Sequence, residues 1–190
     1  MSAVAIVLIV IVALIAALVL FGITGFNKLR KADIAAQEAL GGIDVQLTRR
    51  ADLIPNLVNT VKGYATHEKE LFEEVTKARA SVQQAAQSGT VEQKAAADAG
   101  LTGVLGRLFA VAENYPQLQA SQNFMQLQSE LGDTENKISF ARQYYNDAVS
   151  QLNQLVKTVP WMFFSGVAGV KARDFYQAPE GQQAPPQVQF

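Results

Sequence analysis

The chain has 190 residues, no cysteine, one histidine and a formal net charge of −1. The lack of cysteine excludes disulfides, thiolate metal sites and a cysteine nucleophile. The near-zero charge gives no general bias toward nucleic acid. Ala, Gln, Leu and Val dominate and aromatic residues make up 8%, which is typical of helical proteins.

The first 27 residues predict a transmembrane anchor. They contain no charged side chain, and the run 3–23 is almost entirely Val, Ile, Leu and Ala. At about 1.5 Å per residue this run is long enough to cross a hydrocarbon core of about 30 Å. A cleaved signal peptide would need a basic start and a shorter apolar core. A retained anchor over residues 1–27 is therefore predicted.

Three basic residues follow the anchor directly: Lys28, Arg30 and Lys31. Positive residues prefer the cytoplasmic side, so we expect a single-pass protein of the inner (cytoplasmic) membrane with its N-terminus outside. Residues 28–50 carry five Lys/Arg against three Asp/Glu. This local excess lies beside the membrane and favours anionic lipid headgroups over nucleic acid as its partner.

Residues 28–159 predict an all-α, antiparallel four-helix bundle into which the anchor helix continues. The apolar period predicts helices over about 26–50, 52–87, 91–114 and 117–158. Pro55 is expected to mark the first turn, with Asp52 as the cap of the second helix. Thr90 is expected to cap the third helix. The fourth helix carries a coiled-coil-like stripe at sevens, formed by Phe124, Leu131, Ile138, Tyr145, Leu152 and Val159.

Two further segments allow two interpretations each. Gly100, Gly103 and Gly106 lie near one face of the third helix, so either another backbone approaches there or the helix is locally soft. The tail, residues 160–190, begins with the aromatic residues Trp161, Phe163 and Phe164 and becomes rich in Pro and Gln after residue 178. Its aromatic residues either cover the end of the bundle or contact the membrane interface together with the basic residues after the anchor.

Charged residues on the predicted apolar seams indicate a buried polar network. Glu68 falls on the seam of the second helix, and Glu135 and Arg142 flank that of the fourth. Buried charges are costly unless they are paired, so a network that sets helix register is predicted, with a ligand pocket or a subunit contact as alternatives. We expect Glu68 to pair with Arg79, Arg142 or an arginine of the first helix. The predicted members are Arg49, Glu68, Arg79, Glu135 and Arg142.

No catalytic residue, metal site or cofactor is predicted. A di-iron bundle needs Glu-x-x-His on two helices, but the single histidine, His67, has Tyr64 in the required position. The spacing Gly100-x-x-Gly103-x-x-Gly106 lacks the Lys-Ser/Thr of a phosphate-binding loop. The chain is therefore expected to be non-enzymatic.

Several stretches together resemble the bacterial LemA family: 43–58, 61–65, Glu113-Asn114-Tyr115-Pro116, 124–131 and 134–138. The resemblance covers about residues 26–159. It implies a helical bundle with a short N-terminal tail outside and the bulk in the cytoplasm, and it implies no established enzymatic activity. The tail departs from the family pattern, because Val159-Pro160-Trp161 and Val167-Ala168-Gly169-Val170 replace a Phe-Pro and Gly-Phe segment.

Three classes of function remain. The first is a homo-oligomeric structural scaffold that organises a patch of membrane. The alternative is a membrane-tethered regulatory adaptor that recruits another protein. An enzyme or ligand sensor comes last, because it would need a pocket with convergent polar groups.

Overall fold

A computed structural model describes residues 3–177, which form helices without any strand. The all-α prediction is confirmed: a long apolar N-terminal helix continues into a helical bundle. The helices are α1 (Ala3–Lys62), α2 (Lys69–Ser88), α3 (Val91–Ala112), α4 (Pro116–Gln119), α5 (Gln122–Lys157) and α6 (Met162–Ala168).

The described residues divide into two compact units. The first unit comprises residues 3–39 and 146–174, and the second comprises 40–145 and 175–177. Helices α1 and α5 contribute residues to both units, so the division does not follow the predicted boundaries after residues 27 and 159. The Pro/Gln-rich part of the tail lies outside the described residues.

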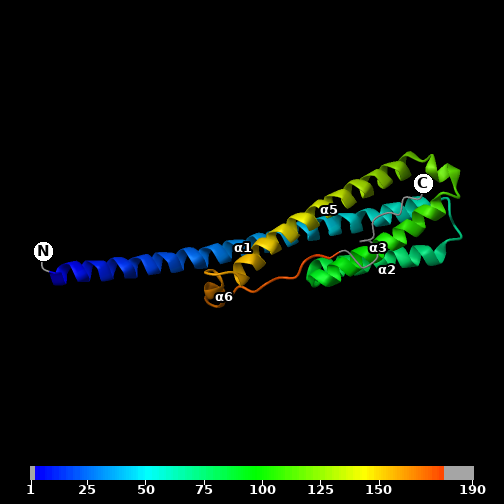
Figure 1. Ribbon diagram of the computed structural model, residues 1–190. Helices are drawn as coiled ribbons and strands as arrows, with labels where there is room; N and C mark the ends of the chain where they lie inside the picture. Colours follow the sequence, from blue (N-terminus) through cyan, green and yellow to red (C-terminus); the bar gives the residue numbers. More distant parts are fainter. Residues whose placement is uncertain (1–2, 178–190) are drawn as a thin grey trace, which may run out of the picture. The chain divides into compact units, whose positions relative to one another are not determined.

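Helix α1 runs without a break through Pro55 (Figure 1), so the prediction that Pro55 marks the first turn is wrong. Proline has no backbone N–H and therefore leaves the carbonyl four residues earlier without its helical partner. That carbonyl belongs to Ala51, and the Arg79 Nε–H of α2 donates to it at 2.9 Å. An arginine of the neighbouring helix thus replaces the hydrogen bond that Pro55 cannot make.

The chain reverses at residues 63–68 instead. The Val61 carbonyl accepts hydrogen bonds from the backbone N–H groups of Tyr64 and Ala65 at 3.0 and 2.9 Å, which closes the last turn of α1. Tyr64, which falls within the helix expected over 52–87, lies in this turn and is 41% exposed. The predicted second helix is therefore divided between α1 and α2.

Helices α2 and α3 form a hairpin (Figure 1). The predicted cap at Thr90 is confirmed: its hydroxyl oxygen accepts from the Gln93 N–H at 3.2 Å. The Gln93 side chain accepts from the Thr90 N–H at 2.9 Å in return. This reciprocal capping box satisfies two backbone donors that the first turn of α3 leaves free.

Neighbouring helices of the second unit run in opposite directions, because residues further along one helix contact residues nearer the start of the next. Cross-helix contacts join α1 to α2 in reverse order, and α3 to α5 in reverse order. The contacting pairs are Ala51–Arg79, Lys62–Phe72, Asp98–Arg142 and Phe109–Phe124. These pairings fit the antiparallel bundle expected for short connections.

The apolar stripe of α5 forms part of the core. Phe124, Leu131, Ile138, Tyr145 and Leu152 are at most 5% exposed, but Val159, the last member of the predicted stripe, lies beyond the end of α5 and is 68% exposed. Each such side chain contributes on the order of 1.5–3 kcal/mol when fully buried. The helix itself begins at Gln122 rather than 117, because the single turn α4 precedes it.

Candidate functional site

Four charged side chains from three helices meet inside the second unit. Asp98 of α3 is completely buried. Its Oδ1 accepts a hydrogen bond from Arg50 Nη1 of α1 at 2.7 Å, and its Oδ2 pairs with Arg142 Nη2 of α5. Glu135 of α5 completes the set, with Oε2 2.7 Å from Arg50 Nη1 as an ion pair outside hydrogen-bond geometry, and Oε1 4.0 Å from Arg142. Two positive and two negative charges alternate, so the cluster is neutral overall.

Tyr176 borders this charged cluster. Its ring is 4% exposed, and the Arg142 guanidinium lies 5.2 Å from its centroid. Burial raises the pKa of the Tyr176 hydroxyl, and the negative charge of Asp98 raises it further. Burial alone would lower the pKa of Arg142, but Asp98 and the smaller contributions of Tyr176 and Glu135 outweigh it and raise the pKa. Both groups therefore keep their neutral-pH protonation state well into the alkaline range.

A second buried cation lies one helical turn before Asp98. The Lys94 ammonium, 4% exposed, pairs with Asp44 of α1 and donates to the Ala86 carbonyl of α2 at 3.1 Å. A buried ammonium is costly unless it is paired and hydrogen-bonded. Lys94 meets both conditions and ties α1, α2 and α3 together.

The structure brings together two of the five residues expected in the polar network. Glu135 and Arg142 lie in the cluster, but Arg49 is exposed and its neighbour Arg50 takes the inward position. Arg79 reaches the Ala51 carbonyl instead. Glu68 is half-buried at the N-cap of α2 and has no ion pair within residues 3–177. Its expected seam position does not exist, because the helical register is interrupted between residues 63 and 68.

The residues that the prediction missed do carry a sequence signal. Arg50 follows Leu29, Ala36 and Ile43 at sevens within the predicted first helix. Asp98 lies seven residues before Leu105, and Lys94 seven before Leu101. Charged side chains at seam positions of two facing helices were therefore visible in the predicted helices 26–50 and 91–114. Tyr176 has no comparable signal, because it lies outside any helix.

The outward side of α3 is lined by small residues. An added Cβ at Gly100, Gly103 or Gly106 would meet nothing within 4 Å, so within the described chain no backbone approaches them. Ala96 and Ala110 are exposed as well. Together these residues form a small-residue stripe, defined here as Ala96, Gly100, Gly103, Gly106 and Ala110, that leaves room for an outside partner.

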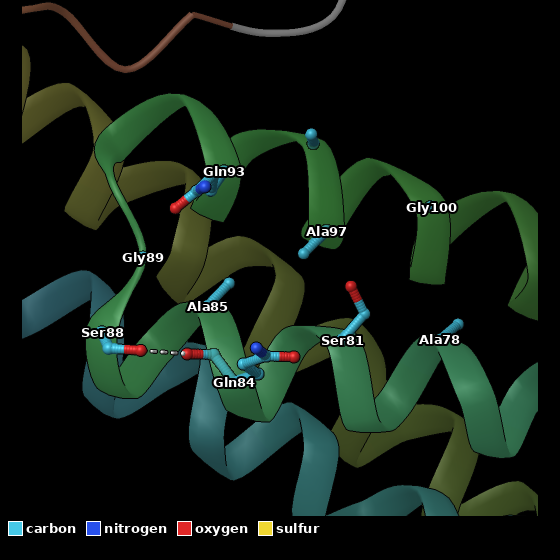
Figure 2. Close-up of a pocket in the computed structure, with 10 residues that line it drawn as sticks. Ala78, Ser81, Gln84, Ala85, Ser88, Gly89, Gln93, Ala97 and Gly100 are labelled. Carbon is cyan, nitrogen blue, oxygen red and sulfur yellow. Dashed lines mark hydrogen bonds between the residues drawn. The ribbon is translucent and has the colours of Figure 1, made fainter.

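A groove of about 670 Å³ lies between α2 and α3 next to this stripe. Ser81 of α2 and Ala97 of α3 point into it from opposite sides (Figure 2). Gly100 lines both the groove and the stripe, and the remaining lining is mostly Ala, Ser and Gln. The lining includes no ionisable side chain, so the groove suits the packing of another helix better than acid–base chemistry.

An aromatic cluster joins α6 to α1 in the first unit. The Trp161 ring lies 5.9 Å from Phe21, and the Phe164 ring meets Phe21 edge-on at 5.5 Å. The Lys28 ammonium lies 4.3 Å from the Trp161 ring centroid. Of the residues expected at the membrane interface, Lys28, Trp161 and Phe164 thus lie together. Arg30, Lys31 and Phe163 are exposed.

The segment after α6 is held by one asparagine. The Asn153 amide donates to the Arg173 carbonyl at 2.8 Å and accepts from the Arg173 N–H at 2.9 Å. The Arg173 side chain pairs with Asp33 of α1 at 2.8 Å. An amide side chain that pairs in this way substitutes for a backbone partner, so the segment lies in a defined place without secondary structure.

The ionisable groups of the described residues were compared with the needs of a metal site and of a catalytic carboxylate. No group of three or more His, Asp or Glu residues that could hold a metal ion occurs among residues 3–177. His67 lies exposed in the turn between α1 and α2. The buried carboxylate of Asp98 is enclosed by two arginines and has no access to a substrate.

Among the described residues, two helices are long and apolar enough to cross a membrane, α1 and α3. The most apolar window of α1 has no buried residue. By contrast, α3 uses Lys94 and Asp98 in the ion pairs of the bundle and buries Leu101, Leu105 and Leu108. The apolar residues of α3 are thus explained by the bundle, whereas the side chains in the most apolar window of α1 are not buried by the described chain.

These features define a membrane-associated helical protein with a self-contained polar interior. A sequence profile of the LemA family matches residues 39–190. The chain belongs to the LemA family.

Similar proteins include two proteins named as magnetosome proteins. Magnetosome protein MamQ 2 of Paramagnetospirillum magneticum is 28% identical over 157 residues, which cover 70% of this chain and 58% of the relative. Magnetosome protein MamQ of Magnetospirillum gryphiswaldense is 26% identical over 170 residues, which cover 77% of this chain and 62% of the relative. The chain therefore spans less than two thirds of the length of these relatives.

Proposed function

We propose that this protein is a non-enzymatic scaffold, anchored in the inner membrane by α1 and assembled into homo-oligomers through the outer face of α3. The apolar run of α1 supports the anchor, because its side chains are exposed over a length that matches the bilayer. Lys28, Arg30 and Lys31 are exposed at its end. Basic residues beside a membrane span prefer the cytoplasmic side, so these three support an orientation with the N-terminus outside.

The observation that carries the oligomer is the small-residue stripe of α3. Small residues allow two helices to approach closely, because no side chains separate the backbones. Glycine inside a helix costs about 1 kcal/mol relative to alanine, yet Gly100, Gly103 and Gly106 all face outward. Close packing against a second copy of the chain would offset this cost, whereas no contact within the described chain does so.

The similar MamQ proteins are, by their names, associated with the magnetosome. That similarity fits a role in membrane organisation. A helix from a different protein in the α2–α3 groove would instead define the adaptor alternative, and the test below distinguishes the two.

The test is the mass of the full-length chain in mild detergent, compared with two glycine variants. Gly103→Leu fills the stripe, whereas Gly132→Leu fills an equally open position on α5 and gains the same helix propensity. We expect a multimer for the wild type and for Gly132→Leu, and a smaller particle for Gly103→Leu. A monomer for all three proteins, at every concentration and also in vesicles, would refute the scaffold and leave the adaptor.

A further inference from the structure

Helix α6 has one face that is bound to α1. An added Cβ on Gly25 would lie 2.7 Å from the Phe164 ring, so the ring packs directly on the α1 backbone. Phe21 contacts both Phe164 and Trp161. This face of α6 is therefore docked at one defined place along α1.

The other face of α6 has no cover within the described chain. Phe163 is 70% exposed and Val167, one turn later, is 79% exposed; Met162 beside them is 41% exposed. No charged residue occurs between Lys157 and Lys171. A helix of seven residues cannot span a bilayer, and these side chains belong to no protein core.

The docking place of α6 indicates what covers this face. The apolar run of α1 starts at Ala3, and about 30 Å of helix, the thickness of the hydrocarbon core, ends near Phe21 to Gly25. Lys28, the first charged residue of the chain, lies over the Trp161 ring. Tryptophan and lysine side by side are typical of the headgroup layer. The contacts with α1 therefore hold α6 at the depth where hydrocarbon gives way to headgroups.

We propose that α6 is an interfacial helix whose face of Met162, Phe163 and Val167 inserts into the headgroup–acyl boundary beside the end of the anchor. The occupant is lipid: Trp161 and Phe164 hold α6 against Phe21, at the end of the exposed apolar run of α1, and lipid chains need no matching shape. The chain then meets the bilayer with two elements, α1 and α6. The packing of the Phe164 ring on Gly25 holds these two elements together. The inference rests on the proposed anchor but not on the proposed oligomer.

The test places a single tryptophan on this face of the full-length protein in vesicles of phosphatidylcholine and phosphatidylglycerol. Trp161 is the chain's one tryptophan, so Trp161→Phe gives a silent background. Phe163→Trp then reports on α6. Phe140→Trp on α5 is the matched control, because Phe140 is 71% exposed but is flanked by Lys137 and Arg142 in the second unit.

We expect brominated acyl chains to remove most of the emission of Phe163→Trp, and acrylamide in the water to leave it nearly unchanged. Phe140→Trp should show the opposite pattern. Helix content by circular dichroism verifies that both variants fold. A Phe163→Trp probe that is quenched by acrylamide, or shielded from both quenchers by a second copy, would overturn the proposal.

An alkaline wash of the vesicles separates this proposal from that of the anchor. Protein that stays in the bilayer while the Phe163→Trp probe remains in water would refute the role of α6 alone. Protein that washes off the vesicles would refute the anchor and α6 together. The quenching pattern does not depend on particle mass, so failure of the oligomer leaves it standing.

Discussion

The two compact units of the chain solve opposite problems. In the second unit, charged side chains that would be costly to bury find their partners inside: Asp98 with two arginines, and Lys94 with Asp44 and a carbonyl. In the first unit, apolar side chains that would be costly to expose remain uncovered along α1 and on α6. In the first arrangement each buried charge has an opposite charge beside it within the unit, whereas in the second the exposed apolar side chains have no cover within the described chain.

This difference separates structural from functional features. A buried ion pair with all its partners present sets helix register and offers nothing to a ligand. Exposed apolar surface of the extent seen on α1 and α6 marks an interaction site. The interface with the surroundings is therefore expected in the first unit and on the open face of α3, and not at the charged cluster, although that cluster is the most polar place in the interior.

The largest effect is expected from Asp98→Asn. The substitution keeps the shape but leaves Arg50 and Arg142 with a single carboxylate, Glu135, between them. Breaking a buried ion pair in this way costs about 3–5 kcal/mol. The measurement is chemical unfolding of the full-length chain in detergent, followed by circular dichroism.

The matched control for Asp98→Asn is Glu74→Gln. It also breaks a pair between two helices, with Arg107, but both side chains are about half exposed. Exposed pairs contribute about 1 kcal/mol or less. If Asp98→Asn lowered the free energy of unfolding no more than Glu74→Gln does, the interior charges would not hold the bundle together.

Much of the fold could be predicted from the sequence, because a periodic apolar pattern reports directly on burial. The uncharged start, most of the α5 stripe and the Thr90 cap could all be predicted from the sequence. The members of the charged cluster were harder to predict, because they depend on helix register. Reading Pro55 as a turn placed Glu68 on a seam that the chain does not have. The choice of Arg49 was a separate error, because Arg50 and not Arg49 follows Ile43 by seven residues. The compensating hydrogen bond from Arg79 joins residues 28 positions apart, and no local pattern reveals such a contact.

A double-mutant cycle tests whether Arg79 replaces the hydrogen bond that Pro55 cannot make, and its effect on the free energy of unfolding is expected to be intermediate. Arg79→Met keeps the apolar stem but leaves the Ala51 carbonyl without a donor, at a cost of about 1–3 kcal/mol. In a Pro55→Ala background the new N–H of residue 55 can bond to the same carbonyl, so the cost of Arg79→Met should fall to a few tenths of a kcal/mol. The readout is the free energy of unfolding of all four proteins. Equal costs in both backgrounds would show that Arg79 stabilises the bundle by another contact.

The smallest effect is expected in the first unit, from Lys28→Gln. The ammonium of Lys28 over Trp161 contributes about 0.5–1 kcal/mol at an exposed site, and the stability of the bundle does not depend on it. Unfolding of the helices should therefore change little, while the emission of Trp161 shifts because its polar neighbour is lost.

Lys31→Gln removes the same charge beside the anchor but touches no described aromatic ring, so it should leave the emission unchanged. A shift of equal size in both variants would mean that Trp161 senses the general charge of the membrane surface rather than its contact with Lys28. A large loss of stability in Lys28→Gln would break the contrast between the two units, because the aromatic cluster would then support the fold as the buried ion pairs do.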